Sequence, residues 1–124
     1  QLVDDSTVKM HFHTIMKDEF VIPEHFSCFE HGTFVIKQDI GFTEDKMLTI
    51  SAALEKEYLE RFDNCLGHFM GKSDNDTYAE ITFGKTLGKT REICYGYFDI
   101  DAGIELMNLY RPESTALDFW YLIA

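Results

Sequence analysis

The segment TEDKMLTISAALEKEYLERFDNCLGHFM, residues 43–70, carries the strongest pattern in the chain. Apolar side chains recur in it at steps of three or four residues, and charged side chains fill the positions between them. This spacing predicts one long amphipathic helix over residues 43–70. Thr43 or Ser51 has the hydroxyl group needed to cap its start. Gly67 or Gly71 is typical of its end.

Shorter segments on both sides of this helix have the patterns of β-strands. In residues 7–17, Val8, Met10 and Phe12 alternate with polar side chains, which predicts a strand with one buried face. Residues 20–22 and 33–40 are rich in β-forming residues and predict two further strands. Residues 77–83 and 91–100 also alternate, and the glycine-bearing link between them predicts a hairpin.

The C-terminal region predicts a helix that docks on the sheet. Residues 104–110 fit either another strand or a short helix that Gly103 weakens. Pro112 interrupts the chain, and Ser114 or Thr115 can cap a final helix over residues 116–124. Since no repeat or linker is present, we expect one α+β domain over residues 1–124. It would be a mainly antiparallel sheet packed against one long helix and a short C-terminal helix.

The composition points to a packed, acidic protein. Of 124 residues, 45% are hydrophobic, as in a globular domain, and 22 acids outnumber 11 bases to give a formal net charge of −11. Such a charge repels nucleic acid and anionic lipid, and it favours a basic protein partner. It also serves solubility.

The cysteine pattern indicates a reducing compartment. Cys28, Cys65 and Cys94 lie far apart and form no Cys-x-x-Cys pair, so we expect reduced thiols and a cytoplasmic protein. Neither a signal-peptide pattern nor a run of about 18 apolar residues occurs, so neither secretion nor a membrane span is expected.

No segment carries a specific catalytic or cofactor motif. The stretch GKTLGKT, residues 84–90, resembles part of a phosphate-binding loop, but its glycines are one residue too close together. His11 and His13 would share one face of a strand, as metal-binding pairs do. A metal needs three or four ligands, however, and a solvent-facing pair explains these histidines equally well. We therefore expect no catalysis, no metal and no cofactor.

Acids and tyrosines gather in YGYFDIDAGIEL, residues 95–106. If the strand predicted over residues 91–100 continues, Tyr95, Tyr97, Asp99 and Asp101 project from one face, with Glu105 close behind. Such a surface suits an inhibitor of a basic enzyme, because carboxylates can lie where a nuclease expects phosphates. A general acid/base pair and ordinary exposed carboxylates are the alternatives for these acids.

In size, charge and architecture the chain resembles the bacterial toxin-immunity proteins of the contact-dependent growth inhibition type. Those proteins are small, acidic, cytosolic and α+β, and they lack catalytic motifs. The resemblance implies a tight one-to-one complex with a cognate toxin domain, often a nuclease. It rests on no diagnostic motif, so the candidate contacts come from the charge and aromatic pattern alone.

We therefore expect a non-enzymatic immunity or antitoxin protein that blocks the active site of a basic toxin. Its predicted contact residues are Tyr95, Tyr97, Asp99, Asp101 and Glu105, with Asp74 and Asp76 as a second patch. The alternative is a small-ligand binder, or an enzyme of another α+β family, that uses a pocket between the sheet and the 47–70 helix. An apolar cavity on the order of several hundred Å³ with convergent His or Asp groups would favour this alternative.

Overall fold

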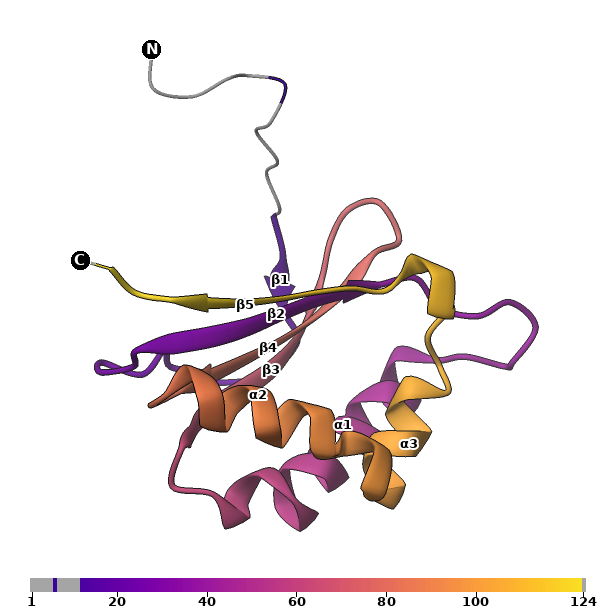
Figure 1. The fold of residues 1–124 in the computed structure, drawn as a ribbon. Helices are drawn as coiled ribbons and strands as arrows, with labels where there is room; N and C mark the ends of the chain where they lie inside the picture. The colour runs from indigo at the N-terminus through magenta and orange to yellow at the C-terminus, as the bar shows by residue number, and fades with distance from the viewer. Residues whose placement is uncertain (1–5, 7–11, 124) are drawn as a thin grey trace.

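An antiparallel sheet forms the centre of the computed structural model, which describes residue 6 and residues 12–123. Within these residues the sheet has five strands in the order β1-β3-β4-β2-β5 (Figure 1). In chain order they are β1 (Thr14–Ile15), β2 (Cys28–Phe34), β3 (Cys65–Lys72), β4 (Tyr78–Gly84) and β5 (Ala116–Tyr121). The predicted α+β class with a mainly antiparallel sheet is confirmed.

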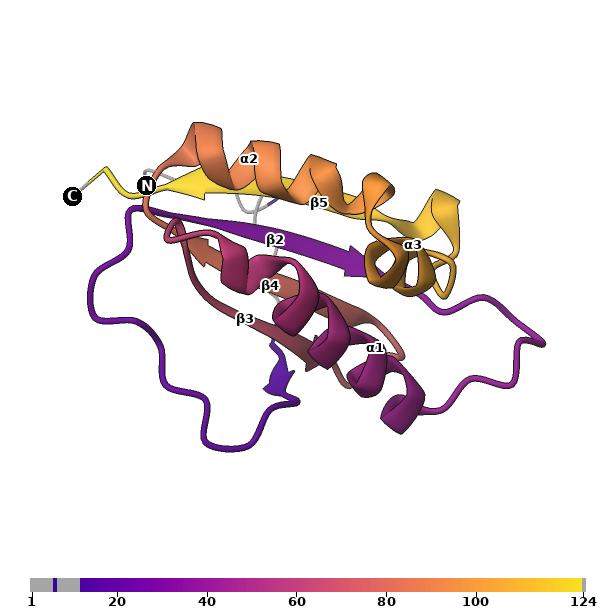
Figure 2. The ribbon, with the colours of Figure 1, turned by 90° about the horizontal axis from the view of Figure 1, so that it is seen from below.

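The helices lie together on one face of this sheet (Figures 1 and 2). They are α1 (Glu44–Glu57), α2 (Leu87–Tyr95) and α3 (Asp101–Met107), with the 3₁₀ turn η3 (Gly96–Asp99) between the last two. Helix α1 connects β2 to β3, and the α2–η3–α3 segment connects β4 to β5. This β-α-β-β-α-β order with β4 and β2 at the centre is the ferredoxin-like arrangement, extended here by β1 beside β3.

Both faces of the central strands are buried. Between the sheet and the helices, Phe34, Met47, Leu54, Met70 and Leu106 are almost fully enclosed. The opposite face carries a second apolar cluster of Phe69, Ala79, Ile81 and Phe83. Phe20 and Phe26 cover part of it, with ring centroids 4.9 Å from Phe69 and 4.7 Å from Phe83. Segment 18–27 therefore covers one region of the second face.

The helix predicted over residues 43–70 begins as expected but ends early. The Thr43 hydroxyl accepts a hydrogen bond from the backbone N–H of Lys46 at 3.1 Å, as a helix cap does. Helix α1 ends at Glu57, and residues 65–72 form β3 instead. Because β3 carries buried side chains on both faces, its short apolar run does not show the alternation of a one-sided strand. Its residues therefore also fit the helical spacing.

The hairpin predicted from residues 77–83 and 91–100 is wrong in its second half. Residues 78–84 form β4 as predicted, but residues 87–95 are helical. The Thr86 hydroxyl caps this helix by accepting from the backbone N–H of Lys89 at 3.4 Å. The Tyr58 hydroxyl then donates to the carbonyl of Ile93 at 2.7 Å. Tertiary contact thus overrides the β preference of Ile93, Tyr95 and Tyr97.

Other predicted elements also shift. Residues 116–121 form the edge strand β5, not a helix, and pair with β2 along six residue positions. Residues 101–107 are helical through Gly103. Residues 20–22 form no strand, and β2 begins at Cys28, before the predicted 33–40 strand. Of the 7–17 strand, residues 14–15 are β1, and residues 7–11 lie outside the described residues.

Within the described part of the chain, no helix combines the length and apolar character that crossing a membrane requires.

Two helical glycines provide a matched test of this packing. A Cβ atom at Gly103 would lie 2.4 Å from the carbonyl oxygen of Tyr97, whereas one at Gly88 would meet nothing within 4 Å. Gly103→Ala should therefore lower the free energy of unfolding by about 1–3 kcal/mol or more, because backbone must move. Gly88→Ala should leave it unchanged or raise it by up to about 1 kcal/mol. Urea unfolding followed by circular dichroism measures both, and equal effects would contradict the close approach of α3 to η3.

Candidate functional site

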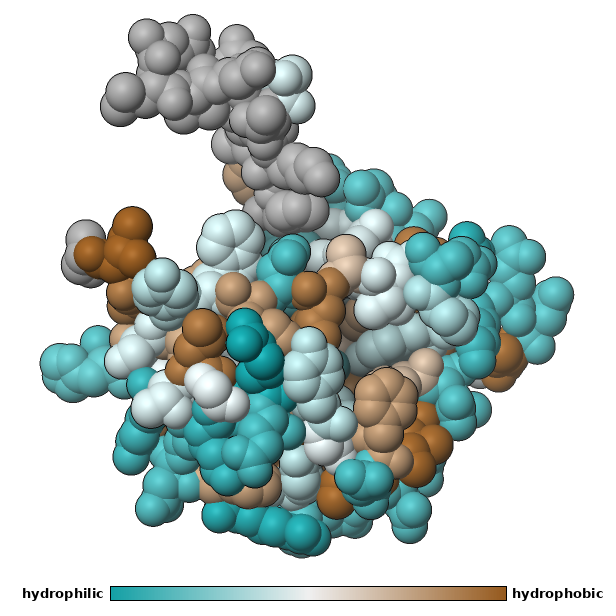
Figure 3. All heavy atoms as spheres, in the orientation of Figure 1, coloured by the Kyte–Doolittle hydropathy of each residue, from teal (hydrophilic) through white to brown (hydrophobic). Residues whose placement is uncertain are grey.

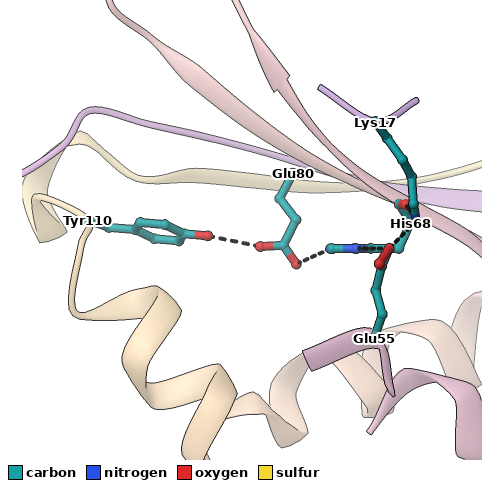
Figure 4. Close-up of polar contacts among 5 residues, drawn as sticks. All are labelled: Lys17, Glu55, His68, Glu80 and Tyr110. Atoms are coloured by element: carbon teal, nitrogen blue, oxygen red, sulfur yellow. Dashed lines mark hydrogen bonds and ion pairs between the residues drawn. The ribbon is translucent and has the colours of Figure 1, made fainter. Parts of the chain in front are cut away.

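A row of polar side chains crosses the interior between the sheet and the helices (Figure 4). The Tyr110 hydroxyl donates to Glu80 Oε2 on β4 at 2.9 Å. Glu80 Oε1 forms an ion pair with His68 Nε2 on β3 at 3.2 Å. His68 Nδ1 contacts Glu55 Oε1 on α1 at 3.2 Å. Lys17 pairs with Glu55 and donates to the carbonyl of His68 at 2.9 Å.

His68 is the charged centre of this row. Its side chain is only 2% exposed, and both ring nitrogens face a carboxylate. Burial opposes protonation, but the contacts with Glu55 and Glu80 outweigh burial and raise the pKa of His68 to about 9. The imidazole is therefore a cation at neutral pH, paired with the two acids.

The two buried acids nearest the centre of the sheet have opposite pKa shifts. Burial would raise the pKa of Glu80, but contact with His68 and nearby tyrosine hydroxyls lowers it, so Glu80 is ionised. Burial and the neighbouring Glu80 charge both raise the pKa of Glu30 on β2 well above its usual value. Glu30 is therefore a neutral carboxylic acid beside a charged one.

A cavity of about 460 Å³ lies beside these acids, between strands β2 and β5 and the α2–η3–α3 segment. Figure 3 views the side that carries β5 and α2, where brown and pale side chains interrupt the hydrophilic surface between the strand and the helices. The wall is mostly apolar. It includes Phe34, Cys94, Phe98, Met107, Pro112 and Leu117, and Lys37 also lines the cavity.

Polar groups converge on one part of this apolar pocket. Glu30, Glu80, Tyr97 and Tyr110 line it, and each is less than 9% exposed. Gly32 provides space for them, because a Cβ atom there would lie 3.0 Å from Glu30 Oε1 and 3.4 Å from Leu117 Cδ1. The arrangement can receive a small molecule with an apolar body and a hydrogen-bonding group.

The strand predicted to carry the acidic face is wrong, because this segment is helical. Tyr97 is buried, and Tyr95 is exposed at the end of α2, although both line the pocket. Asp99 ends the η3 turn, and Asp101 and Glu105 lie on α3. All three acids are exposed. A strand would have projected Tyr95, Tyr97, Asp99 and Asp101 together, whereas helical turns point them in different directions.

The remaining candidates lie elsewhere. Asp74 and Asp76 are exposed in the turn between β3 and β4. His13 approaches His31 on β2, with 3.2 Å between their Nε2 atoms, and His11 lies outside the described residues. Among residue 6 and residues 12–123, no three His, Cys, Asp or Glu side chains are arranged to hold a metal ion.

Three residues of the site were missed in the sequence: Glu30, His68 and Glu80. Each stands in a run of apolar or β-forming residues, and Glu80 alternates with Ala79 and Ile81. His68 was placed in the predicted 43–70 helix, and no role was predicted for Glu30 or Glu80. The available signal was an ionisable residue within a strand that is buried on both faces. Recognising such a strand requires knowledge of its neighbouring strands, which the sequence does not provide.

Comparison with known proteins identifies relatives in fold only. Neither a known protein family nor a curated protein matches the sequence. A conserved protein from Methanosarcina mazei is 10% identical with a TM-score of 0.55, over 77% of this chain and 92% of that one. A heme-degrading enzyme from Listeria monocytogenes is 8% identical with a TM-score of 0.55, and the match covers 88% of this chain and 69% of the enzyme. A NIPSNAP family protein from Agrobacterium tumefaciens is 15% identical with a TM-score of 0.50, over 86% and 94%.

These findings overturn the prediction of an immunity or antitoxin protein. The solved structures that share the fold include a heme-degrading enzyme and a NIPSNAP family protein. The pocket beside Glu30 and Glu80 has the size and apolar walls expected for the alternative, a small-ligand domain, but its converging groups are Glu and Tyr and not His or Asp. Its position differs from the prediction, since β5 and α2–η3–α3 form its walls and α1 does not.

The charge on His68 predicts a specific dependence of stability on pH. The folded-state pKa of about 9 exceeds the usual value of 6.5, so this stabilisation is complete below about pH 6.5 and is lost as the pH rises through 9. At about 1.4 kcal/mol per pKa unit, the free energy of unfolding should fall by up to about 3 kcal/mol over this range. His68→Gln should remove most of that dependence.

Urea unfolding at several pH values measures this effect, and NMR titration of the imidazole reports the pKa directly. The exposed His25 offers a matched control, because His25→Gln should retain the wild-type pH dependence. An imidazole at position 68 that titrates at or below pH 6.5 would contradict the ion-paired arrangement.

Proposed function

We propose that this chain is a small-molecule-binding domain whose ligand occupies the pocket between β2, β5 and the α2–η3–α3 segment. The convergence of Glu30, Glu80, Tyr97 and Tyr110 in an otherwise apolar cavity carries the proposal. A volume of about 460 Å³ falls within the range of about 300–1,000 Å³ that is typical of ligand sites. Apolar walls would supply affinity, and the few polar groups would fix orientation.

Apolar surface left exposed in a pocket and buried polar atoms without partners are both costly for a protein. Removing apolar surface from water stabilises by about 25 cal/mol per Å², and a buried polar atom without a partner costs about 1–3 kcal/mol. Glu30 Oε2 and Tyr97 Oη form no hydrogen bond of good geometry within the described residues. A bound molecule would fill the space and satisfy these atoms, so both costs favour a binding role.

The polar groups suit binding better than catalysis. Glu80 is the charged acid, but Oε1 faces His68 and Oε2 accepts from Tyr110. These contacts lower its pKa, and a carboxylate of low pKa is a weak general base. Burial and nearby carboxylates raise the pKa of the Cys94 thiol, so Cys94 is not an activated nucleophile. The proposed function is therefore binding without a chemical step.

Haem does not fit the residues of this pocket. Haem iron in proteins is held by histidine, cysteine thiolate, tyrosine, or methionine together with histidine. The described lining contains no histidine, and the Cys94 thiol remains protonated. Burial and the charge of Glu80 raise the pKa values of Tyr97 and Tyr110, so both remain neutral phenols. The activity of the Listeria neighbour is therefore not transferred to this chain.

Filling the pocket should prevent binding. Leu117 lines the cavity from β5, so Leu117→Trp should place an indole in the space and weaken binding of 2-acetylnaphthalene by at least about tenfold. NMR titration of backbone amides measures the affinity and locates the probe. In the wild-type protein, shifts should concentrate in β2, β5 and the α2–η3–α3 segment.

Leu122→Trp is the matched control. Leu122 is exposed beyond the end of β5 and does not line the pocket, so this variant should bind as the wild type does. Equal effects of the two tryptophans, or probe-induced shifts confined to the opposite face of the sheet, would contradict the proposed site.

A further inference from the structure

Two polar atoms mark where a ligand would make its hydrogen bonds. Glu30 Oε2 and Tyr97 Oη form no hydrogen bond of good geometry within the described residues, although Thr82 lies near Glu30 and Glu80 lies near Tyr97. Their side chains are only 4% and 5% exposed. Both side chains line the cavity. Since nearly all buried polar atoms in proteins are paired, these two are the positions that a bound molecule would satisfy.

Both groups act as hydrogen-bond donors. Burial and the charge of Glu80 raise the pKa of Tyr97, so its hydroxyl keeps its proton. Burial and the same charge raise the pKa of Glu30, and no cation in the described residues forms an ion pair with it. A protonated carboxyl donates through its O–H. The ligand group that would pair with these two donors is therefore a hydrogen-bond acceptor.

The charge of Glu80 disfavours an ionic group on the ligand next to Glu30 and Tyr97. Glu80 already faces His68 and Tyr110, so a cationic ligand would have to compete with an existing ion pair. An anionic ligand would add a second negative charge beside Glu80 in a buried site. An uncharged acceptor avoids both costs.

We propose that the pocket selects uncharged, mainly apolar molecules that carry a carbonyl group. The carbonyl oxygen accepts hydrogen bonds from the Glu30 carboxyl and the Tyr97 hydroxyl. This inference rests on the proposed function. The walls formed by Phe34, Met107 and Leu117 contact the apolar part of such a molecule. The ligand class is therefore an apolar ketone, aldehyde, ester or amide.

Three probes of nearly equal shape separate the possible ligand classes. They are 2-acetylnaphthalene, which has the carbonyl, 2-ethylnaphthalene, which lacks it, and 1-(2-naphthyl)ethylamine, which is cationic at neutral pH. The ketone should bind the wild-type protein about tenfold more tightly than the hydrocarbon, as expected for one or two buried hydrogen bonds. The amine should bind no more tightly than the hydrocarbon.

Tyr97→Phe tests one donor. This variant should reduce the preference for the ketone by about threefold or more and leave hydrocarbon binding unchanged. Tyr58→Phe is the matched control, because the Tyr58 hydroxyl donates to the Ile93 carbonyl at 2.7 Å and does not line the pocket. It should lower stability towards urea and keep the ketone preference. Tyr97→Phe removes a hydroxyl that forms no hydrogen bond of good geometry within the described residues, so it should cost less stability than Tyr58→Phe.

Glu30→Gln tests the other donor with little change in volume. Infrared difference spectra between wild type and Glu30→Gln should show the carbonyl stretch of a protonated carboxylic acid in the wild type. That band should move to lower frequency when the ketone binds, because its O–H then donates. Absence of the band at neutral pH would show that Glu30 is ionised and would overturn the inference.

The outcomes separate this inference from the proposed function. Equal binding of ketone and hydrocarbon, or tighter binding of the amine, would overturn the carbonyl preference and leave a binding pocket in place. If none of the three probes bound in the pocket, both the inference and the proposed function would be overturned.

Discussion

A protonated histidine held between a buried carboxylate, Glu80, and a partly exposed one, Glu55, connects the helical layer to the sheet. Glu55 reaches His68 from α1, and Glu80 reaches it from the neighbouring strand β4. Charges taken out of water are tolerated only when they are paired, and removal of one partner leaves the others uncompensated. The positions of α1, β3 and β4 are therefore coupled through one imidazole, in addition to the apolar contacts between the layers.

The same ion pair determines the chemistry of the neighbouring pocket. Because His68 compensates Glu80, Glu80 remains charged inside the protein, and that charge together with burial keeps Glu30 neutral. The pocket thus contains one carboxyl of each kind within a largely apolar wall. His68, which stabilises the packing of α1 on the sheet, therefore also determines which hydrogen bonds the pocket can make on the other side of Glu80.

The sequence predicted the fold class, the start of α1 at Thr43 and the strand near residues 78–84, because these depend on local patterns. It did not predict β3 or α2, where burial on both faces and tertiary contacts outweigh local preference. Tyr95 and Tyr97 were selected for a different role, on the assumption that they lay in a strand. Glu30, His68 and Glu80 come together only through strand pairing and register, and no local spacing encodes that proximity.

The space in the pocket beside Glu30 depends on the absence of a side chain at Gly32. A methyl group there would lie 3.0 Å from Glu30 Oε1 and 3.4 Å from Leu117 Cδ1. A larger side chain would have to displace both, so it would reduce the room beside the Glu30 carboxyl. A single residue without a side chain thus keeps the polar end of the pocket accessible to a guest molecule.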